Sequence, residues 1–218
     1  MRWAAIDFET ANAKRDSACA LGIVIVEGQK IIKKASWLIR PPNLIFDPIN
    51  ICIHGITRAD VIHQPNFNEL WSNIYRHLEG NLILAHYACF DMSVLRHVLD
   101  IYGIPYPRLS YYCTHVIAKR LWPDLGWFGL EDVARHLRIR FKHHVPDEDA
   151  YACAKIALRA CHQEKVRTLE EVAKRFQIRK GDLFPGGYKP CGIDSKFRVD
   201  KKLLAYREIL ENASLINK

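Results

Sequence analysis

The sequence predicts an α/β fold: a mixed central sheet that begins with an antiparallel three-strand meander and is flanked by helices. Three short runs rich in apolar and β-branched residues open the chain, and Glu27-Gly28-Gln29-Lys30 between the second and the third is a hairpin signal. A fourth apolar run follows a helical pattern, and most of the remaining sequence has helical periodicity. This order of strands and helices is typical of a sheet covered by helices.

Four strands are expected, over residues 3–8, 20–26, 31–39 and 82–85. The first is an apolar run that ends in acidic residues, and the second and third flank the hairpin turn. Arg40-Pro41-Pro42-Asn43 ends the third strand because proline has no backbone N–H to donate. Residues 44–64 show no regular period, so we expect irregular structure there.

Several later segments repeat apolar residues every three or four positions, which is typical of amphipathic helices. We expect helices over 66–78, 91–102, 114–122, 129–137 and 147–162. Gly103 and Pro123 follow two of these segments as stop signals. A last helix is expected over 200–212, behind a segment rich in glycine and proline.

The chain has 218 residues, of which 49% are hydrophobic and 26% charged, so it can bury a core of its own. We expect one main domain over residues 1–164 and a short C-terminal extension over 165–218. The formal net charge is +8, of which +2 lies in the domain and +6 in the extension. Such an excess is either an ordinary solvated surface or a footprint for nucleic-acid phosphates, and charge alone leaves both interpretations open.

The sequence predicts a cytoplasmic protein without a membrane partner. Its apolar stretches are far shorter than the ~20 residues of a transmembrane helix, and Asp7 stands where a signal peptide has its apolar core. The seven cysteines are scattered and include no C-x-x-C pair, so neither a zinc site nor a redox pair is indicated. We expect reduced and mostly buried thiols.

Asp7 and Glu9 stand at the end of the first expected strand, with Phe8 between them. Alternate residues of a strand face the same way, so the two carboxylates share one side of the sheet. A divalent cation would compensate two acids placed side by side behind an apolar run. The alternative is a strand end at which both acids meet water.

Two further segments pair histidine with aspartate. His86 follows the fourth strand and Asp91 opens the next helix, where the alternatives are a hydrogen-bonded core histidine and a helix cap. His143-His144 precedes an acidic helix start, in which Asp149 lies near the apolar face and needs a partner. A histidine on the loop that enters this helix can reach the same site.

These segments form an ordered set: D-x-E on the first strand, H-x-A-x-F-D after a later strand, and H-x(4)-D-A on a late helix. The set resembles the DEDDh 3′–5′ exonucleases of the RNase H-like superfamily, and within them the exonucleases similar to the epsilon subunit of bacterial DNA polymerase III. The resemblance covers residues 1–163 and includes H-G-I-T at 54–57 and Cys113-Thr114. In one position the chain departs from the pattern, because Tyr87 stands where the family usually has asparagine.

The resemblance implies an RNase H-like fold and an exonuclease that releases nucleoside 5′-monophosphates from 3′ ends by a two-metal mechanism. The implied ligands of two Mg²⁺ ions, for which Mn²⁺ can substitute, are Asp7, Glu9, Asp91 and Asp149. The family spacing implies His144 as the general base, five residues before the last aspartate, with His143 as the alternative. The residues implied to bind substrate are Phe8, Thr10, His54, Ile56 and His86.

We expect DNA as the substrate, with single-stranded 3′ ends preferred, and a role in repair or proofreading with a DNA polymerase or another replication or repair protein as partner. RNA is the alternative substrate for the same chemistry. Two alternatives to a nuclease come from other classes of protein. The first is a polymerase accessory module that binds nucleic acid without catalysis, and the second is a metal-dependent phosphatase of another fold. The basic extension is expected to hold nucleic acid away from the cleavage point.

Overall fold

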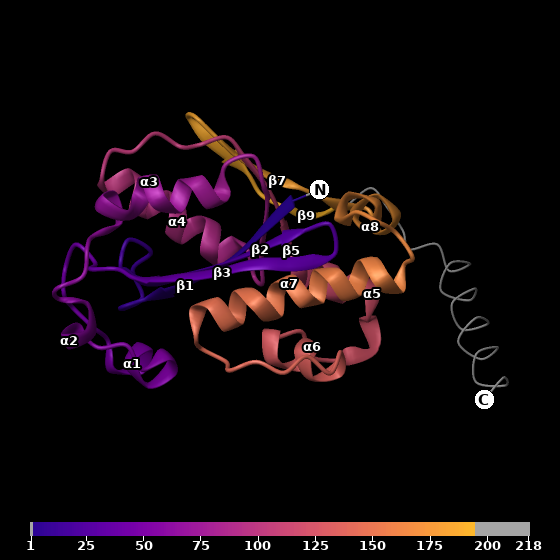
Figure 1. Ribbon diagram of the computed structural model, residues 1–218, viewed down its shortest axis with the longest axis horizontal. Coiled ribbons are helices and arrows are strands. Elements are labelled where there is room, and N and C mark those ends of the chain that lie inside the picture. The colour runs from indigo at the N-terminus through magenta and orange to yellow at the C-terminus, as the bar shows by residue number, and fades with distance from the viewer. Residues whose placement is uncertain (1, 195–218) are drawn as a thin grey trace, which may run out of the picture.

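The computed structural model describes residues 2–194. Its centre is a seven-stranded sheet in the order β3-β2-β1-β4-β5-β7-β8 (Figure 1). The strands are β1 (Arg2–Thr10), β2 (Ala18–Glu27), β3 (Lys30–Leu38), β4 (Leu82–Ala85), β5 (Leu109–Cys113), β7 (Gly181–Phe184) and β8 (Gly187–Lys189). The first three strands form an antiparallel meander, whereas β4 and β5 run parallel to β1. The mixed sheet and its meander were predicted from the sequence.

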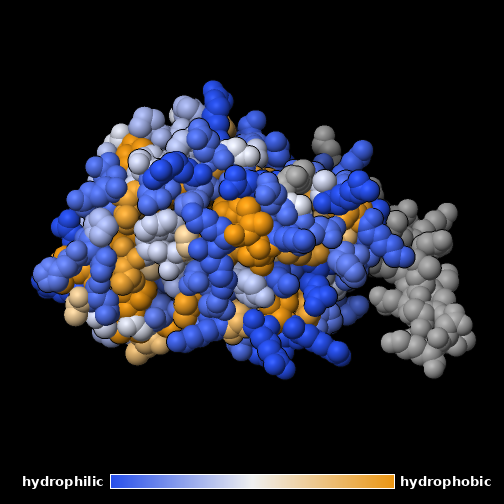
Figure 2. All heavy atoms as spheres, viewed as in Figure 1, coloured by the Kyte–Doolittle hydropathy of each residue, from blue (hydrophilic) through white to orange (hydrophobic). Residues whose placement is uncertain are grey.

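Helices cover both faces of the sheet (Figure 1). They are α1 (Pro48–His54), α2 (Arg58–Val61), α3 (Phe67–Leu78), α4 (Cys89–Ile101), α5 (Thr114–Leu121), α6 (Leu130–His136), α7 (Pro146–Gln163) and α8 (Leu169–Phe176), with a 3-10 turn η1 at Pro123–Leu125. The core on one face is built with α3 and α4, and the core on the other with α5 to α8. The face in Figure 2 is mostly polar, with apolar residues in separate patches. Among the described residues, no helix is long and apolar enough to cross a membrane.

The alternation of β1 separates these two cores. Trp3 and Ala5 pack on the α7 side, whereas Ala4 and Ile6 pack on the α4 side, and all four side chains are buried. Asp7 continues the alternation of Trp3 and Ala5. Its carboxylate is therefore directed to the α7 side at the carboxyl end of β1.

The region over 44–64, which we expected to be irregular, contains α1 and α2. Asp47 caps α1 by accepting a hydrogen bond from the Ile49 amide at 2.8 Å, and Gly55 ends the helix with a φ of 77°. Helices of seven and four residues are too short to show a helical period, which is why the pattern did not reveal them. The strand β5 was missed for a related reason, since its five residues do not alternate between apolar and polar.

The described part of the extension, residues 165–194, is built into the fold. Leu169 and Val172 of α8 pack in the same core as α7, and β7 pairs with β5 while forming a hairpin with β8. A separate two-stranded pair joins β6 (Ile178–Arg179) to β9 (Gly192–Ile193). The helix expected over 200–212 lies outside the described residues.

Candidate active site

The first two acids of the site, Asp7 and Glu9, come from the carboxyl end of β1. Asp7 pairs in register with Gly22 of β2. At Gly22 the start of α7 lies directly on the sheet, because a Cβ at this position would be only 2.0 Å from the carbonyl carbon of Pro146. Glycine permits this close approach of two backbones, which brings the first turn of α7 beside Asp7.

Lys34 of β3 also holds the first turn of α7. Its ammonium group forms ion pairs with Asp147, at 3.8 Å, and with Glu148, and it lies 4.6 Å from the centre of the Tyr151 ring. Acidic residues in the first turn are favoured by the helix dipole, and Pro146 suits the first helical position. These contacts fix the position of the helix start that carries the third acid.

Asp149 brings that third carboxylate to the site. One carboxylate oxygen each from Asp7, Glu9 and Asp149 lie within 4.8 Å of one another. Asp149 is 4% exposed, and its Oδ2 accepts the backbone N–H of His144 at 3.0 Å. Its Oδ1 is buried and has no hydrogen-bond partner among residues 2–194. A buried carboxylate oxygen without a donor is unfavourable, and a bound cation is one way to satisfy this atom.

Asp91 reaches the site from the first turn of α4 and is 1% exposed. Its Oδ1 accepts the backbone N–H of Phe8 at 3.0 Å. This hydrogen bond ties α4 to β1 between Asp7 and Glu9. The four predicted acids are therefore brought together from β1, α4 and α7.

Burial disfavours the ionised form of all four carboxyl groups in this cluster. Burial raises the pKa of Glu9 to about 7, that of Asp149 to about 7 and that of Asp91 to about 8. Burial also raises the pKa of Asp7 well above its ordinary value, and the neighbouring carboxylates add to the effect. Four such groups cannot all be ionised without a compensating cation. An all-oxygen donor set suits Mg²⁺ or Mn²⁺.

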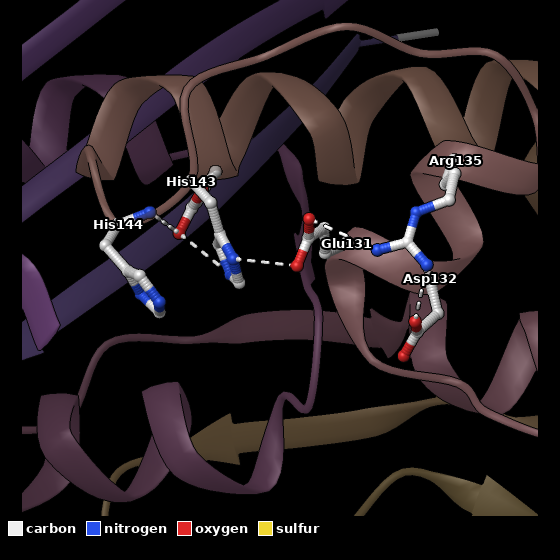
Figure 3. A network of polar contacts seen from close by, with 6 residues as sticks. Glu131, Asp132, Arg135, His143 and His144 are labelled. Atoms are coloured by element: carbon white, nitrogen blue, oxygen red, sulfur yellow. Dashed lines mark hydrogen bonds and ion pairs between the residues drawn. The ribbon is translucent and has the colours of Figure 1, made fainter.

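His143 and His144 lie on the loop that enters α7, with their rings stacked 3.8 Å apart (Figure 3). His143 stands between two carboxylates, with Nε2 3.8 Å from Asp149 Oδ2 and Nδ1 3.9 Å from Glu131 Oε2. The ring of His144 forms no hydrogen bond or ion pair among the residues that the structure describes, although it interacts electrostatically with His54 and His143. Its backbone has a φ of 62° in the left-handed region. Ring nitrogens of both histidines also lie within 4.8 Å of Asp149, so they form a second group that can hold a metal.

Four of the five residues predicted to bind substrate surround the end of β1. The Phe8 ring is buried in the core, 6.3 Å from the Phe67 ring, and the Phe8 backbone N–H donates to Asp91. The Thr10 carbonyl accepts from His54 Nε2 at 3.2 Å, and His54 Nδ1 accepts the Ile56 N–H at 3.0 Å. Burial lowers the pKa of His54. The H-G-I-T loop is thus fastened to β1, with both ring nitrogens of its histidine engaged.

The fifth of these residues, His86, is a hydrogen-bonded structural residue. Its Nε2 donates to the Phe128 carbonyl at 2.9 Å, and its Nδ1 accepts from Thr114 Oγ1 at 2.9 Å. Burial lowers the pKa of His86 to about 4, which keeps the ring neutral. The core-histidine alternative therefore describes His86, because it has no free ring nitrogen for a substrate. Tyr87 is 55% exposed with a φ of 68°, and its ring lies 4.8 Å edge-on to the His115 ring.

One residue that shapes the site, Gly22, was not predicted from the sequence. Gly22 carried a readable signal, since a glycine inside a strand pattern marks close backbone approach.

Comparison with known sequences identifies the family of the chain. An exonuclease family model matches residues 4–157. The chain is 28% identical over 158 residues to DNA polymerase III subunit epsilon of Treponema pallidum, covering 70% of this chain and 73% of that protein. It is 29% identical over 176 residues to the PolC-type DNA polymerase III of Thermotoga maritima, covering 78% of this chain but only 13% of the polymerase.

Solved structures share the fold. Exonuclease X in complex with 5′-overhanging duplex DNA matches with a TM-score of 0.65 and 24% identity over 80% of this chain and 99% of that one. The nuclease domain of 3′hExo, a DEDDh family member bound to rAMP, matches with a TM-score of 0.67 and 16% identity over 76% of this chain and 94% of that one. The chain therefore belongs to the exonuclease family and has the RNase H-like fold of these solved structures.

Proposed function

We propose that the chain removes nucleoside 5′-monophosphates from the 3′ ends of DNA, preferring single strands. The observation that carries this proposal is the convergence of Asp7, Glu9, Asp91 and Asp149 at one edge of the sheet. No one of these acids would distinguish an exonuclease from a chance acidic surface. Their burial and mutual proximity make the edge a site for divalent cations.

Two cations, Mg²⁺ or Mn²⁺, fit the residues present. Asp7, Glu9 and Asp149 would hold one ion, Asp7 would bridge to the other, and Asp91 would complete the cluster. Bound cations supply the charge that stabilises the scissile phosphate and the attacking water. The fit rests on the unpartnered Asp149 Oδ1 and on the raised pKa values of the four carboxyl groups.

His144 is the general base in this proposal. Histidine is the most common general base in proteins. The ring of His144 forms no hydrogen bond or ion pair within the described part of the chain, and one of its nitrogens lies within 4.8 Å of an Asp149 carboxylate oxygen. His143 is less suited, because the carboxylates of Asp149 and Glu131 lie beside its two nitrogens. The hydrogen bond from the His144 N–H to Asp149 holds the base beside the metal ligand.

The terminal nucleotide is proposed to lie between the end of β1 and the loop that carries His54 and Ile56. With the ring nitrogens of His54 engaged, this loop offers backbone and apolar groups to the sugar and the base. The named relatives favour DNA, since two of them are DNA polymerase III proteins and Exonuclease X was solved with DNA. The rAMP bound to 3′hExo makes RNA the second candidate. A polymerase partner and a cytoplasmic location stay predictions.

The proposal is tested by digestion of 5′-end-labelled single-stranded DNA, duplex DNA and matched RNA with Mg²⁺. We expect stepwise shortening of single-stranded DNA from the 3′ end, its loss in EDTA, and its recovery with excess Mg²⁺. Asp7→Asn should be inactive and folded, whereas Asp124→Asn, which removes an exposed carboxylate from η1, should be fully active. Activity retained in Asp7→Asn would refute the site, and faster digestion of RNA would refute the substrate.

A further inference from the structure

A cavity of about 510 Å³ lies between α4 and the β7–β8 hairpin, outside the acidic cluster. Cys89, Ser93 and Arg96 line it from one face of α4. Tyr188 and Cys191, from β8 and the residues that follow it, line the opposite wall. This second wall comes from the C-terminal extension, which lies beyond the residues that match the exonuclease family model.

The cavity reaches the N-terminus of α4 at Cys89, whereas Asp91 leaves the same turn on the opposite face of the helix, because two residues rotate an α-helix by about 200°. A strand that binds both the cavity and the acids therefore passes over the N-terminus of α4. Cys89 stands two residues before Asp91 on α4, and the Cys191 thiol hydrogen-bonds to the Cys113 thiol at the end of β5. Cys113 Sγ in turn accepts the Ala88 N–H at 3.4 Å, in the residue before α4. From Cys89 the cavity follows α4 for two turns, ~10 Å. Three stacked nucleotides at ~3.4 Å each occupy a similar length.

The far end of the cavity combines an arginine with an aromatic ring. The guanidinium carbon of Arg96 lies 3.7 Å from the centre of the Tyr188 ring, and the Tyr188 side chain is half exposed. Arg96 also hydrogen-bonds to the Tyr106 hydroxyl, but its Nε is buried with no hydrogen-bond partner in the described residues. Lys189 of the same hairpin lines a neighbouring cavity of about 300 Å³. Positive charge beside an exposed ring is the combination that binds single-stranded nucleic acid.

We propose that this cavity, here named the α4–β8 groove, holds the part of the substrate strand 5′ to the scissile phosphate. Arg96 binds a phosphate and Tyr188 stacks on a base. The inference rests on the proposed exonuclease function and deepens it, because it assigns the described part of the extension to substrate binding. If the α4–β8 groove binds the strand in this way, it contributes to the binding of an oligonucleotide but not to the binding of a single nucleotide.

The test compares two substrates that undergo the same reaction, hydrolysis of a phosphodiester bond. Thymidine 5′-monophosphate p-nitrophenyl ester fills only the terminal-nucleotide site, whereas single-stranded DNA oligonucleotides also reach the groove. We compare kcat/KM on the oligonucleotide with kcat/KM on the ester and take the ratio of the two. This ratio should fall about tenfold in Arg96→Gln and in Tyr188→Ala, because each variant loses one phosphate contact or one stacked base. Tyr188→Phe should keep the ratio, because the ring is retained. Arg76→Gln, which removes an exposed arginine from α3, is the matched charge control and should keep it too.

Salt dependence gives a second readout that a folding defect would not produce. The slope of log affinity for an oligonucleotide against log salt should become shallower by about 0.7 in Arg96→Gln, for one lost phosphate contact with a single strand. The slope should stay unchanged in Tyr188→Ala and Arg76→Gln. An unaltered ratio in either groove variant, with the wild type active on both substrates, would overturn the groove and leave the exonuclease function standing. Failure of the wild type on both substrates would instead refute the proposed function.

Discussion

Gly22→Ala should disable the active site without abolishing the fold. The added methyl carbon would lie 2.0 Å from the carbonyl carbon of Pro146, 2.1 Å from its oxygen and 2.3 Å from the Asp147 nitrogen. These are backbone atoms, so no side-chain rotation can relieve the overlap. Because ordinary contact begins near 3.4 Å, the start of α7 has to retreat by about 1.4 Å. Overpacking of this kind destabilises a protein by roughly 1–3 kcal/mol.

The retreat of α7 carries Asp149 away from Asp7 and Glu9. Metal ligands hold their distances within about 0.2 Å, so a shift of this size separates the three carboxylates beyond what one cation can bridge. A misplacement of ~1 Å in an active site lowers turnover about 100-fold. We therefore expect a clear loss of Mn²⁺ affinity and a decrease in kcat of about that factor.

For Gly22→Ala we would measure three quantities: the Mn²⁺ affinity by calorimetric titration, kcat on single-stranded DNA, and the midpoint of thermal unfolding. Val24→Ala is the matched control, since it perturbs the same face of β2 by removing volume and does not press on α7. It should lower the thermal midpoint and keep metal affinity. If Gly22→Ala kept wild-type Mn²⁺ affinity and kcat, the reasoning that Gly22 seats the metal ligand would be wrong.

Four further predictions concern the site and its surroundings. His144→Ala should lower kcat at least about 100-fold with little change in DNA affinity, and His143→Ala should be mild; the reverse ranking in single-turnover assays would exchange their roles. In metal-free buffer the free energy of unfolding of the wild type, measured by urea titration, should decrease as the pH rises from about 4 to about 8. The raised pKa values of the carboxyl groups make the folded state bind more protons than the unfolded state over this range. Asp7→Asn removes one of these groups, so the decrease should be smaller in this variant. Tyr87→Asn should raise the unfolding free energy by about 1 kcal/mol, since asparagine tolerates the left-handed backbone better; an unchanged urea midpoint would count against strain at this residue. Removal of 195–218, which carries a net charge of +3, should make the salt dependence of DNA binding shallower while kcat is kept, and an identical slope would show that this charge does not meet DNA.

Local sequence patterns predicted the first four strands with their meander, and the resemblance to the exonuclease family implied Asp91 and Asp149 as partners of Asp7 and Glu9. The period of two placed Asp7 and Glu9 on one side of β1, and the apolar run before Asp91 marked the end of β4. The spacing of His144 and Asp149 came from the family resemblance. Short elements without a full period were missed, as β5 and α1 show.

Contacts between distant segments were decided by the tertiary structure. Packing between separate elements places the start of α7 on Gly22 and brings Asp91 to the Phe8 amide. It also engages the ring nitrogens of His86 in internal hydrogen bonds. The extension was the clearest case: its composition indicated only positive charge, whereas pairing of β7 with β5 made it a wall of the α4–β8 groove. Local periodicity reports which way a side chain faces along its own element, but only the packed chain determines what that side chain meets.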